Sequence, residues 1–402
     1  MRDVELQFDV QYSFPVKFTR DVFNPGNPVL VDILKRTGCL NRILIVIDSN
    51  LAAANPYLIN NIEIYARSWD SVMRIAAPPF IITGGEVCKN GLSEVEKIHS
   101  LINAYHLCRH SFVMAIGGGA VLDAAGFATA TAHRGIHLLR LPTTTLAQND
   151  AGVGVKNGVN MFGKKNFIGT FAPPFAVIND LDFLDTLQER DLRAGIAEAI
   201  KVALIKDRTF FEWLYENRYA LRDFKPDAMA QMIIRCAELH TEHIQTNGDP
   251  FEQGASRPLD FGHWAAHKIE DLADDDVRHG EAVAVGIALD SLYSHYCGLI
   301  SELELYRIMS LIRALGFKLF HPALAKMDIG ESLNNFQEHM GGELTIPLLQ
   351  GIGSLTETHR IDTAKMAKGI ELLADKYVRK GSTNDGKQRA HGGKTGTGSV
   401  LS

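Results

Sequence analysis

Residues 111–142, SFVMAIGGGAVLDAAGFATATAHRGIHLLRLP, decide the fold class of this chain. The first apolar run ends in three glycines, which is typical of a buried strand that closes in a turn. A stretch with helical spacing follows it, and a second apolar run then ends at Pro142. Strand, helix and strand in this order predict a parallel sheet with helices on both faces.

The same alternation precedes this segment, and a different pattern follows it. Apolar runs recur in RILIVID (42–48) and PPFIITGG (78–85), whereas amphipathic helices succeed one another after residue 181. We therefore predict an α/β N-terminal Rossmann-like domain with a parallel sheet (residues 1–181) and an all-α C-terminal domain (182–378). The polar, glycine-rich tail (379–402) is predicted to be disordered, and the active site is expected in the interdomain cleft.

Composition excludes several classes of protein. A length of 402 residues exceeds what one hydrophobic core usually serves, which favours two domains. A formal net charge of −6 argues against a nucleic acid as partner. Five scattered cysteines without CxxC spacing indicate the reduced thiols of a cytoplasmic protein. With no signal peptide in MRDVELQFDV and no apolar run of about 18 residues, we predict no membrane association.

The turn GGGAVLDAAG (117–126) follows a predicted strand and begins a predicted helix. Backbone N–H groups at Gly118 and Gly119 could bind phosphate, because the helix dipole favours anions there. The GxGxxG fingerprint is absent, so a tight structural turn is the alternative. Asp48, which ends the first strong strand, could bind a ribose or cap a helix.

The segment LPTTTLAQNDAGVGVKNGVNMFGKKNFIGTFAPP (141–174) is interpreted as a long functional loop. Its glycines occur with Asp150, Lys156, Lys164, Lys165 and Asn166. Lysine is a compact charge with three donors, so this mixture indicates an anion-binding surface. A solvated surface loop is the alternative.

Three histidines lie close together in LDFGHWAAHKIEDLADDDVRHGEAVA (259–284). His263 and His267 are four positions apart and share a helical face, and His279 returns on the next predicted helix. Glu198 and Lys201 share another face, inside the apolar GIAEAIKVALI (195–205). Glu198 with two histidines would make a zinc site with an open position. The alternatives are core histidines and an exposed ion pair.

At these motifs the chain resembles the 3-dehydroquinate synthase superfamily, the sugar phosphate cyclases. Residues 117–169 resemble its nucleotide and substrate segment, and GIAEAIK resembles its E-x-x-K element. FGHWAAHKIE and RHGEAVAVG resemble its two metal-histidine motifs. The resemblance implies a dehydroquinate synthase-like fold, a homodimer, NAD, and a divalent metal that is zinc or, alternatively, cobalt.

The resemblance also assigns roles to individual residues. The implied metal ligands are Glu198, His263 and His279. The implied NAD contacts are Asp48, Asn50, Glu86, Lys89, Gly118, Gly119, Asp123, Thr143, Thr144, Lys165 and Thr186. The implied catalytic and substrate-lining residues are Lys156, Lys201, His267, Asp150, Asn166 and Arg134.

The implied activity is that of a carbon–oxygen lyase acting on a seven-carbon sugar phosphate. NAD oxidises a ring hydroxyl transiently, phosphate is eliminated, the hydride returns, and an intramolecular aldol reaction closes a carbocycle. The chain departs from dehydroquinate synthase at Arg257, Asp260 and His339, in segments whose basic groups hold the substrate carboxylate and phosphate in the family enzyme. The substrate is therefore either the shikimate-pathway heptulosonate phosphate or a carboxylate-free sugar such as sedoheptulose 7-phosphate.

Two other classes of protein compete with this hypothesis. A metal-dependent alcohol or glycerol dehydrogenase would have a histidine four positions after the first metal carboxylate, where Val202 stands here. An inactive scaffold would have no reason to keep Glu198, His263, His279, Lys156 and Lys201 together.

Overall fold

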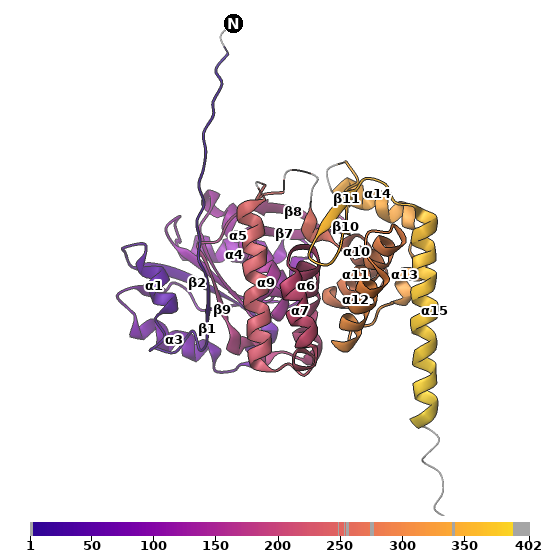
Figure 1. The fold of residues 1–402 in the computed structure, drawn as a ribbon. Helices are drawn as coiled ribbons and strands as arrows, with labels where there is room; N and C mark the ends of the chain where they lie inside the picture. Colours follow the sequence, from indigo (N-terminus) through magenta and orange to yellow (C-terminus); the bar gives the residue numbers. More distant parts are fainter. Residues whose placement is uncertain are drawn as a thin grey trace, which may run out of the picture. The chain divides into compact units, whose positions relative to one another are not determined.

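The computed structural model describes residues 3–247, 249–252, 254, 257–273, 277–339 and 342–388 (Figure 1). The chain divides into two compact units: unit 1 comprises residues 1–202 and 224–253, and unit 2 comprises 203–223 and 254–402. The predicted boundary near residue 182 marks where the helical part begins. The border between the compact units falls later, after Val202, because helix α6 (Glu189–Lys206) begins in unit 1.

A parallel sheet forms the core of unit 1, as the strand–helix alternation predicts. Its strands lie in the order β1-β9-β6-β5-β2-β3, with β4 also beside β2, and every pairing is parallel. The strands are β1 (Val16–Thr19), β2 (Asn41–Asp48), β3 (Met73–Ile75), β4 (Phe80–Ile82), β5 (Phe112–Gly117), β6 (His137–Pro142) and β9 (Ala176–Asp180).

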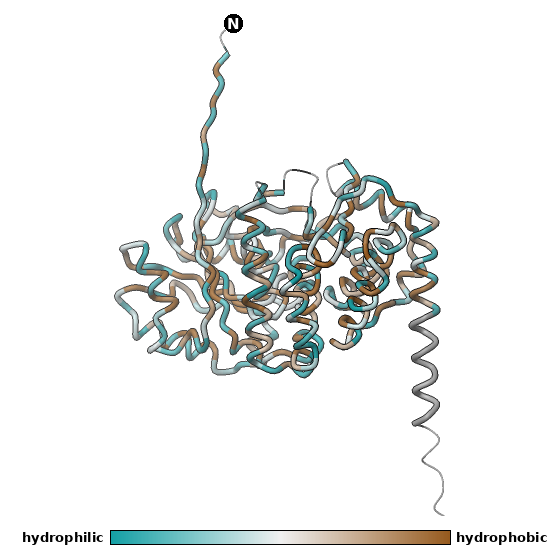
Figure 2. Tube along the Cα trace, in the orientation of Figure 1, coloured by the Kyte–Doolittle hydropathy of each residue, from teal (hydrophilic) through white to brown (hydrophobic). Residues whose placement is uncertain are grey.

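Hydrophobic side chains pack on both faces of the sheet, which explains why its strands have few polar residues. Figure 2 colours much of this part of the chain as hydrophobic. On β2, Ile43, Ile45 and Ile47 pack in one cluster, and Leu44 and Val46 pack in the other. The first cluster includes side chains of α1 (Val29–Lys35) and α3 (Leu58–Ser68). The second includes side chains of α4 (Ser93–Ala104) and α5 (Gly119–Thr131).

The segment 141–174, interpreted from the sequence as a long functional loop, is largely regular structure, so the interpretation as a loop was wrong. It contains the π-helix η3 (Ala147–Ala151) and the antiparallel hairpin β7 (Lys156–Met161) and β8 (Lys164–Phe171). Glycine, asparagine and lysine are uncommon in strands, and most of β8 is exposed, so neither strand has the apolar signal of a buried one. The π-helix is a single turn that no simple periodicity marks.

Helices α6 and α9 (Pro226–Thr246) bring further side chains of unit 1 to η3. A Cβ atom on Gly195 of α6 would lie 2.5 Å from the backbone nitrogen of Leu146, so α6 approaches this backbone at a glycine. The Asn149 side chain donates a hydrogen bond to the Gly195 carbonyl oxygen over 2.7 Å. The part of α6 that carries Glu198 and Lys201 is thereby held beside η3.

Unit 2 is helical, as predicted, with one addition. Its helices are α7 (Arg208–Glu216), α8 (Arg218–Arg222), α10 (His263–Leu272), α11 (His279–Tyr296), α12 (Glu302–Ala314), α13 (Pro322–Lys326), α14 (Ile329–His339) and α15 (Thr363–Gln388). The addition is the antiparallel pair β10 (Ile346–Leu349) and β11 (Leu355–Thr358). Helix α11 is buried along most of its length, so it forms the core of this unit.

The C-terminal end of the chain is only partly described. Helix α15 continues to Gln388, into the segment 379–402 that is predicted to be disordered, and residues 389–402 lie outside the described residues. Among the described helices, none combines the length and the hydrophobicity that crossing a membrane requires.

Candidate functional site

The carboxyl ends of the central strands gather several predicted NAD contacts of unit 1. Asp48 ends β2, Gly117 and Gly118 follow one another at the end of β5, and Thr143 and Thr144 follow β6. These strands are parallel neighbours, so their carboxyl ends share one edge of the sheet. The chain leaves β2 toward β3 and leaves β5 toward β6, in opposite directions. Ligands of open α/β sheets bind at such switch points.

Asp48 lies between two glycines at this edge. A Cβ atom on Gly84 would lie 2.2 Å from Asp48 Oδ1, and one on Gly117 would lie 3.1 Å from Asp48 Cβ. Asp48 also accepts a hydrogen bond from the backbone nitrogen of Asn50 over 2.8 Å and caps helix α2 (Ser49–Ala54). The capping role is therefore observed, and ribose binding by Asp48 stays a prediction.

The start of helix α5 has bare backbone where a phosphate is predicted to bind. Its N-cap is Gly118, which offers no side-chain cap. A Cβ atom on Gly118 would lie 3.2 Å from Thr144 Cγ2, and one on Gly119 would lie 3.3 Å from Ala151 Cβ. A side chain larger than hydrogen at Gly118 or Gly119 would fill the space beside Thr144 and Ala151. The glycines thus keep N–H groups of a 13-residue helix accessible to an anion.

Four further predicted residues meet at the β7–β8 hairpin. Lys89, in the 3-10 turn η1 (Glu86–Lys89), lies 2.7 Å from Asp123 Oδ2 and also donates to Asn166 Oδ1. Glu86 accepts a hydrogen bond from Asn160 of β7 over 2.9 Å. Burial lowers the pKa of Lys89, but the negative charges of Asp123 and Glu86 outweigh it and raise that pKa. Lys89 is therefore a fixed cation that ties α5 to the hairpin.

Asp150, Glu198 and Lys201 form a charged group around η3 and α6. Lys201 makes an ion pair with Glu198, and their side chains are 3% and 0% exposed, so the exposed-pair alternative is wrong. Burial raises the pKa of Asp150, but the positive charges of Lys201 and His240 outweigh burial and lower it to about 2. Asp150 is therefore ionised at neutral pH.

His240 is a member of this group that the sequence did not reveal. It lies on α9, and its Nδ1 is 3.0 Å from Asp150 Oδ1. Its only sequence signal is a histidine among apolar residues of a helix, and such histidines are common in cores. The contact depends on α9 packing against η3, which no local pattern shows.

Arg140 is a second residue that the sequence did not reveal. It is fully buried on β6, and its guanidinium donates to the carbonyl oxygens of Gly152, Gly154 and Lys156 and to Asn157 Oδ1. Burial lowers its pKa to about 10. Arg140 thus holds the backbone between η3 and β7, which connects two predicted substrate residues.

Several predicted residues lie apart from these groups. Lys156 Nζ is 2.6 Å from Glu252 Oε2, and 59% of its side chain is exposed. Lys165 is exposed on β8, and Thr186, which ends the 3-10 segment η4 (Leu181–Thr186), donates to the Phe183 carbonyl oxygen. Arg134 ends η2 (Ala132–Arg134) just before β6, and so lies at the amino-end edge of the sheet, opposite Asp48. The structure does not bring Arg134 to the other predicted residues of its own chain.

The three histidines of unit 2 do come together. The ring centroids of His263 and His279 are 5.4 Å apart, and His267 lies 5.6 Å from His263. His263 Nδ1 is 3.2 Å from the Phe261 carbonyl oxygen, and His279 Nδ1 is 3.3 Å from Glu270 Oε1. Partners at Nδ1 fix the orientation of both rings. The spacing and orientation suit two ligands of one cation.

Asp290, on α11, holds the two residues that flank His263, one by its backbone and one by its side chain, and was also missed in the sequence. Its carboxylate accepts from the Gly262 nitrogen over 2.9 Å and from Trp264 Nε1 over 2.8 Å. Burial raises its pKa to about 7. Gly262 has a φ of 80°, and a Cβ atom there would lie 2.8 Å from the Ile287 nitrogen, so α10 begins in close contact with α11.

The residues that depart from dehydroquinate synthase precede and follow these helices. Asp260 ends the 3-10 turn η5 (Pro258–Asp260), three positions before His263, and is partly buried. Arg257 is the N-cap of the same turn. His339 is the last residue of α14, and its side chain lies outside the described part of the structure.

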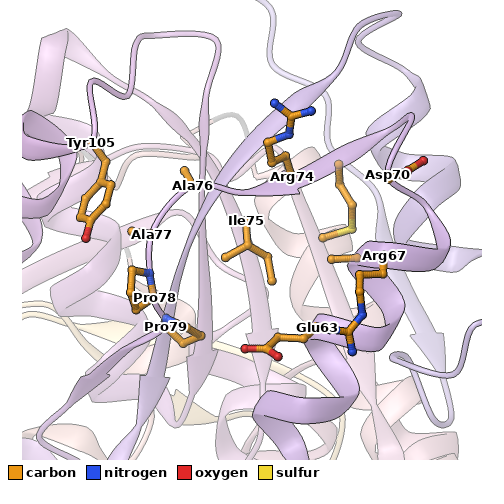
Figure 3. A pocket seen from close by; sticks show the side chains of 12 residues that line it. Glu63, Arg67, Asp70, Arg74, Ile75, Ala76, Ala77, Pro78, Pro79 and Tyr105 are labelled. Carbon is orange, nitrogen blue, oxygen red and sulfur yellow. The ribbon is translucent and has the colours of Figure 1, made fainter.

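A hollow in unit 1 has none of the predicted site residues in its lining (Figure 3). It is lined by side chains such as Glu63, Arg67, Arg74 and Tyr105, close to edge strand β3. We assign it no part in the chemistry.

Comparison with known proteins gives one consistent result. Residues 79–194 match the family described as 3-dehydroquinate synthase N-terminal, and residues 195–339 match 3-dehydroquinate synthase C-terminal. A 3-dehydroquinate synthase of Acidithiobacillus ferrooxidans is 33% identical over 91% of this chain and 96% of its own length. A 2-epi-5-epi-valiolone synthase of Streptomyces glaucescens is 32% identical over 92% of this chain and 93% of its own length.

A solved structure agrees with these sequence matches. It is a 2-epi-5-epi-valiolone synthase from Streptomyces hygroscopicus subsp. jinggangensis, with NAD⁺ and Zn²⁺ bound. It superposes with a TM-score of 0.83 at 29% identity, covering 93% of this chain and all of the other.

Proposed function

Because the chain belongs to the 3-dehydroquinate synthase family, the sugar phosphate cyclases, we propose that it cyclises a heptulose phosphate without a carboxylate, such as sedoheptulose 7-phosphate. The family matches confirm the family that the motifs predicted. They also confirm the predicted enzyme class, a carbon–oxygen lyase acting on phosphates. Sequence identity does not select the substrate, because relatives with two different names are 33% and 32% identical to this chain.

The carboxylate of Asp260 is the feature that favours a substrate without a carboxylate. It stands three residues before His263, where the resemblance expects an asparagine next to the substrate carboxylate. A carboxylate in that place would repel a carboxylate on the sugar, and like charges across a binding site cost several kcal/mol. Asp260 would instead accept hydrogen bonds from sugar hydroxyl groups.

Two features of the structure fit NAD and a divalent metal. The glycines around Asp48 and at the start of α5 leave the bare backbone that a dinucleotide needs. Glu198 offers a carboxylate and His263 and His279 offer ring nitrogens, which are the kinds of ligand that a catalytic zinc ion takes and that the motifs assign to the metal. When bound, NAD would supply reversible oxidation of the sugar, and the metal would supply Lewis acidity at its oxygen atoms.

The charged side chains of unit 1 would position the sugar and stabilise its charges. Asp150, ionised and held by His240, would accept hydrogen bonds from hydroxyl groups. Lys156, which is 59% exposed, would exchange Glu252 for the substrate phosphate. Lys201, paired with Glu198, would offset negative charge that develops on the sugar.

The test is phosphate release from a panel of heptulose phosphates, with the carbocyclic product identified by NMR. We expect release from sedoheptulose 7-phosphate, little release from the heptulosonate phosphate, and no accumulation of NADH. The matched variant is Asp260→Asn, which restores the amide and should raise the relative activity toward the heptulosonate phosphate. A wild-type preference for the heptulosonate phosphate would contradict the assignment of substrate.

The same assay separates the competing classes. A dehydrogenase would accumulate NADH without releasing phosphate, and an inactive scaffold would release phosphate from no member of the panel.

A further inference from the structure

The hairpin of β7 and β8 (Figure 1) is joined to the turn η1 by an asparagine for which no role is predicted from the sequence. Asn160, on β7, donates through its side-chain nitrogen to Glu86 Oε1 over 2.9 Å and to Asn90 Oδ1 over 3.1 Å. Its Oδ1 accepts a hydrogen bond from the backbone nitrogen of Asn166, on β8, over 2.8 Å. One side-chain amide thus holds η1 and its C-cap on one side and the opposite strand of the hairpin on the other.

The backbones of the same two elements also meet at Asn160. The Gly91 nitrogen donates to the Asn160 carbonyl oxygen over 3.0 Å, and Asn90 forms an isolated parallel bridge with Asn160. Contacts through both the backbone and the side chain allow little independent movement of η1 and β7. The two elements therefore behave as one body at this point.

Asn166 is held from a second side by Lys89. The Lys89 ammonium lies 2.7 Å from Asp123 Oδ2 and donates to Asn166 Oδ1. An ammonium group cannot accept a hydrogen bond, so the amide oxygen of Asn166 faces Lys89 and its NH2 group is turned away. Asn166 has a left-handed φ of 52°, which asparagine tolerates better than most residues. Its backbone and its side chain are thus fixed by two different contacts, both of which lead to η1.

The turn η1 borders the carboxyl-end edge of the sheet, where a dinucleotide is predicted to bind. It follows β4 through Gly84 and Gly85, and the Gly84 nitrogen donates to Ser49 Oγ, just after β2, over 2.9 Å. Asp123, which holds Lys89, lies near the start of α5, the helix whose first N–H groups are accessible to an anion. A ligand that orders this edge is therefore connected to the hairpin through Asn160 and Lys89.

We propose that Asn160 is a positioning residue that couples dinucleotide binding at η1 to the hairpin that carries Asn166. When NAD⁺ binds, η1 and the start of α5 become ordered, and the contacts of Asn160 and Lys89 extend that order to the hairpin. A hairpin that is already ordered binds the sugar phosphate at a smaller entropic cost. Coupling of this kind is reciprocal, so the sugar phosphate also strengthens the binding of NAD⁺. The inference rests on the proposed function for the identity of the two ligands.

Hydrogen exchange of the full-length, metal-loaded protein tests the coupling without any sugar. In wild type, NAD⁺ should slow exchange of the hairpin amides, residues 162–171, at least ~5-fold. In Asn160→Ala, NAD⁺ should still protect residues 118–125 at the start of α5, which shows that the nucleotide is bound, but protection of the hairpin should be lost. The matched control is Asn61→Ala, an exposed asparagine on α3 of the same unit, which should behave as wild type.

A second variant separates lost coupling from a damaged hairpin. Asn160→Asp keeps the acceptor for the Asn166 nitrogen but sets a carboxylate against Glu86, so it breaks only the contact with η1. Exchange of the hairpin without NAD⁺ should stay at the wild-type rate, and its protection by NAD⁺ should be lost. The KM for the sugar phosphate should rise at least ~5-fold with little change in kcat, because the loss weakens binding in the ground state and the transition state alike.

Two results overturn the proposal. One is equal protection of the hairpin by NAD⁺ in wild type and both Asn160 variants, and the other is no protection of the hairpin by NAD⁺ in wild type. The exchange experiment uses no sugar phosphate, so the coupling can fail while phosphate release succeeds, and it can be found in a protein that releases no phosphate. Its failure is therefore distinguishable from failure of the proposed function.

Discussion

The candidate residues of unit 1 and those of unit 2 are held in place by different interactions. In unit 1, Asp150, Lys201 and Glu198 are charged side chains that restrain one another, with one buried ion pair and a pKa of about 2 for Asp150. In unit 2, His263 and His279 are oriented by a backbone carbonyl and by Glu270. The first arrangement depends on charge, and the second depends on ring orientation.

This difference between the two units indicates which substitutions should disturb each set of residues. Buried charges lose stability when one partner is removed, because the other is left uncompensated. Histidines held by hydrogen bonds at Nδ1 keep their orientation as long as the supporting backbone stays in place. Substitutions in unit 1 should therefore act through charge, and substitutions in unit 2 should act through position.

The largest effect is expected at Glu198, which belongs to the charged group and is also a proposed metal ligand. Glu198→Gln keeps the shape but removes the charge, so metal retention and phosphate release should be lost together. Metal content after gel filtration and phosphate release are the two measurements. Full activity of this variant would contradict the ligand assignment.

Two controls separate loss of metal from loss of fold. Glu189→Gln lies on the same helix with its side chain 80% exposed and should behave as wild type. His279→Asn leaves the Glu198–Lys201 pair intact and should lose metal without the destabilisation expected of Glu198→Gln.

The fold was predictable where sequence patterns are local. The apolar runs that became β2, β5 and β6, and the helical spacing that became α5, are short-range signals, and the structure confirms them. The β7–β8 hairpin was not predicted, because its strands are too polar to give a buried-strand pattern.

The site was predictable only where motifs are contiguous. The glycines of 117–119 and the histidines of 259–284 lie in single segments, whereas three of the supporting residues do not. His240 reaches Asp150 from 90 positions later in the chain, Arg140 reaches 12 to 17 positions ahead, and Asp290 reaches back 26 and 28 positions. These contacts depend on how helices and strands pack, which no local pattern records.

A smaller effect is expected at Asp290, which holds the Gly262 backbone and the Trp264 side chain beside His263. Asp290→Ala removes the acceptor for two buried N–H groups, so the free energy of unfolding should fall by about 3 kcal/mol. Asp290→Asn keeps one acceptor and should lose about half as much. Urea denaturation measures both. Equal stability of wild type and Asp290→Ala would mean that other residues hold the start of α10 around His263 in place.

The smallest effect is a pH-dependent change in stability at Asp150. It tests the difference between unit 1 and unit 2 because it comes from charge alone. The folded-state pKa lies at about 2, below the ordinary 3.8, so this carboxylate contributes stability above its unfolded pKa and loses it as the pH falls through the folded one. The shift corresponds to about 2 kcal/mol, released between about pH 4 and pH 2. The gap in unfolding free energy between wild type and Asp150→Asn should therefore narrow by that amount on acidification.

Urea denaturation of both proteins, from neutral pH to as low a pH as they stay folded, measures this gap. His240→Asn in the wild-type and Asp150→Asn backgrounds tests the cause, because it removes one of the two positive charges that lower the pKa of Asp150. In that background the gap should narrow less, since Lys201 alone remains to oppose burial. A gap that is independent of pH would show that unit 1 holds Asp150 by shape, as unit 2 holds its histidines, and would remove the distinction between the two regions.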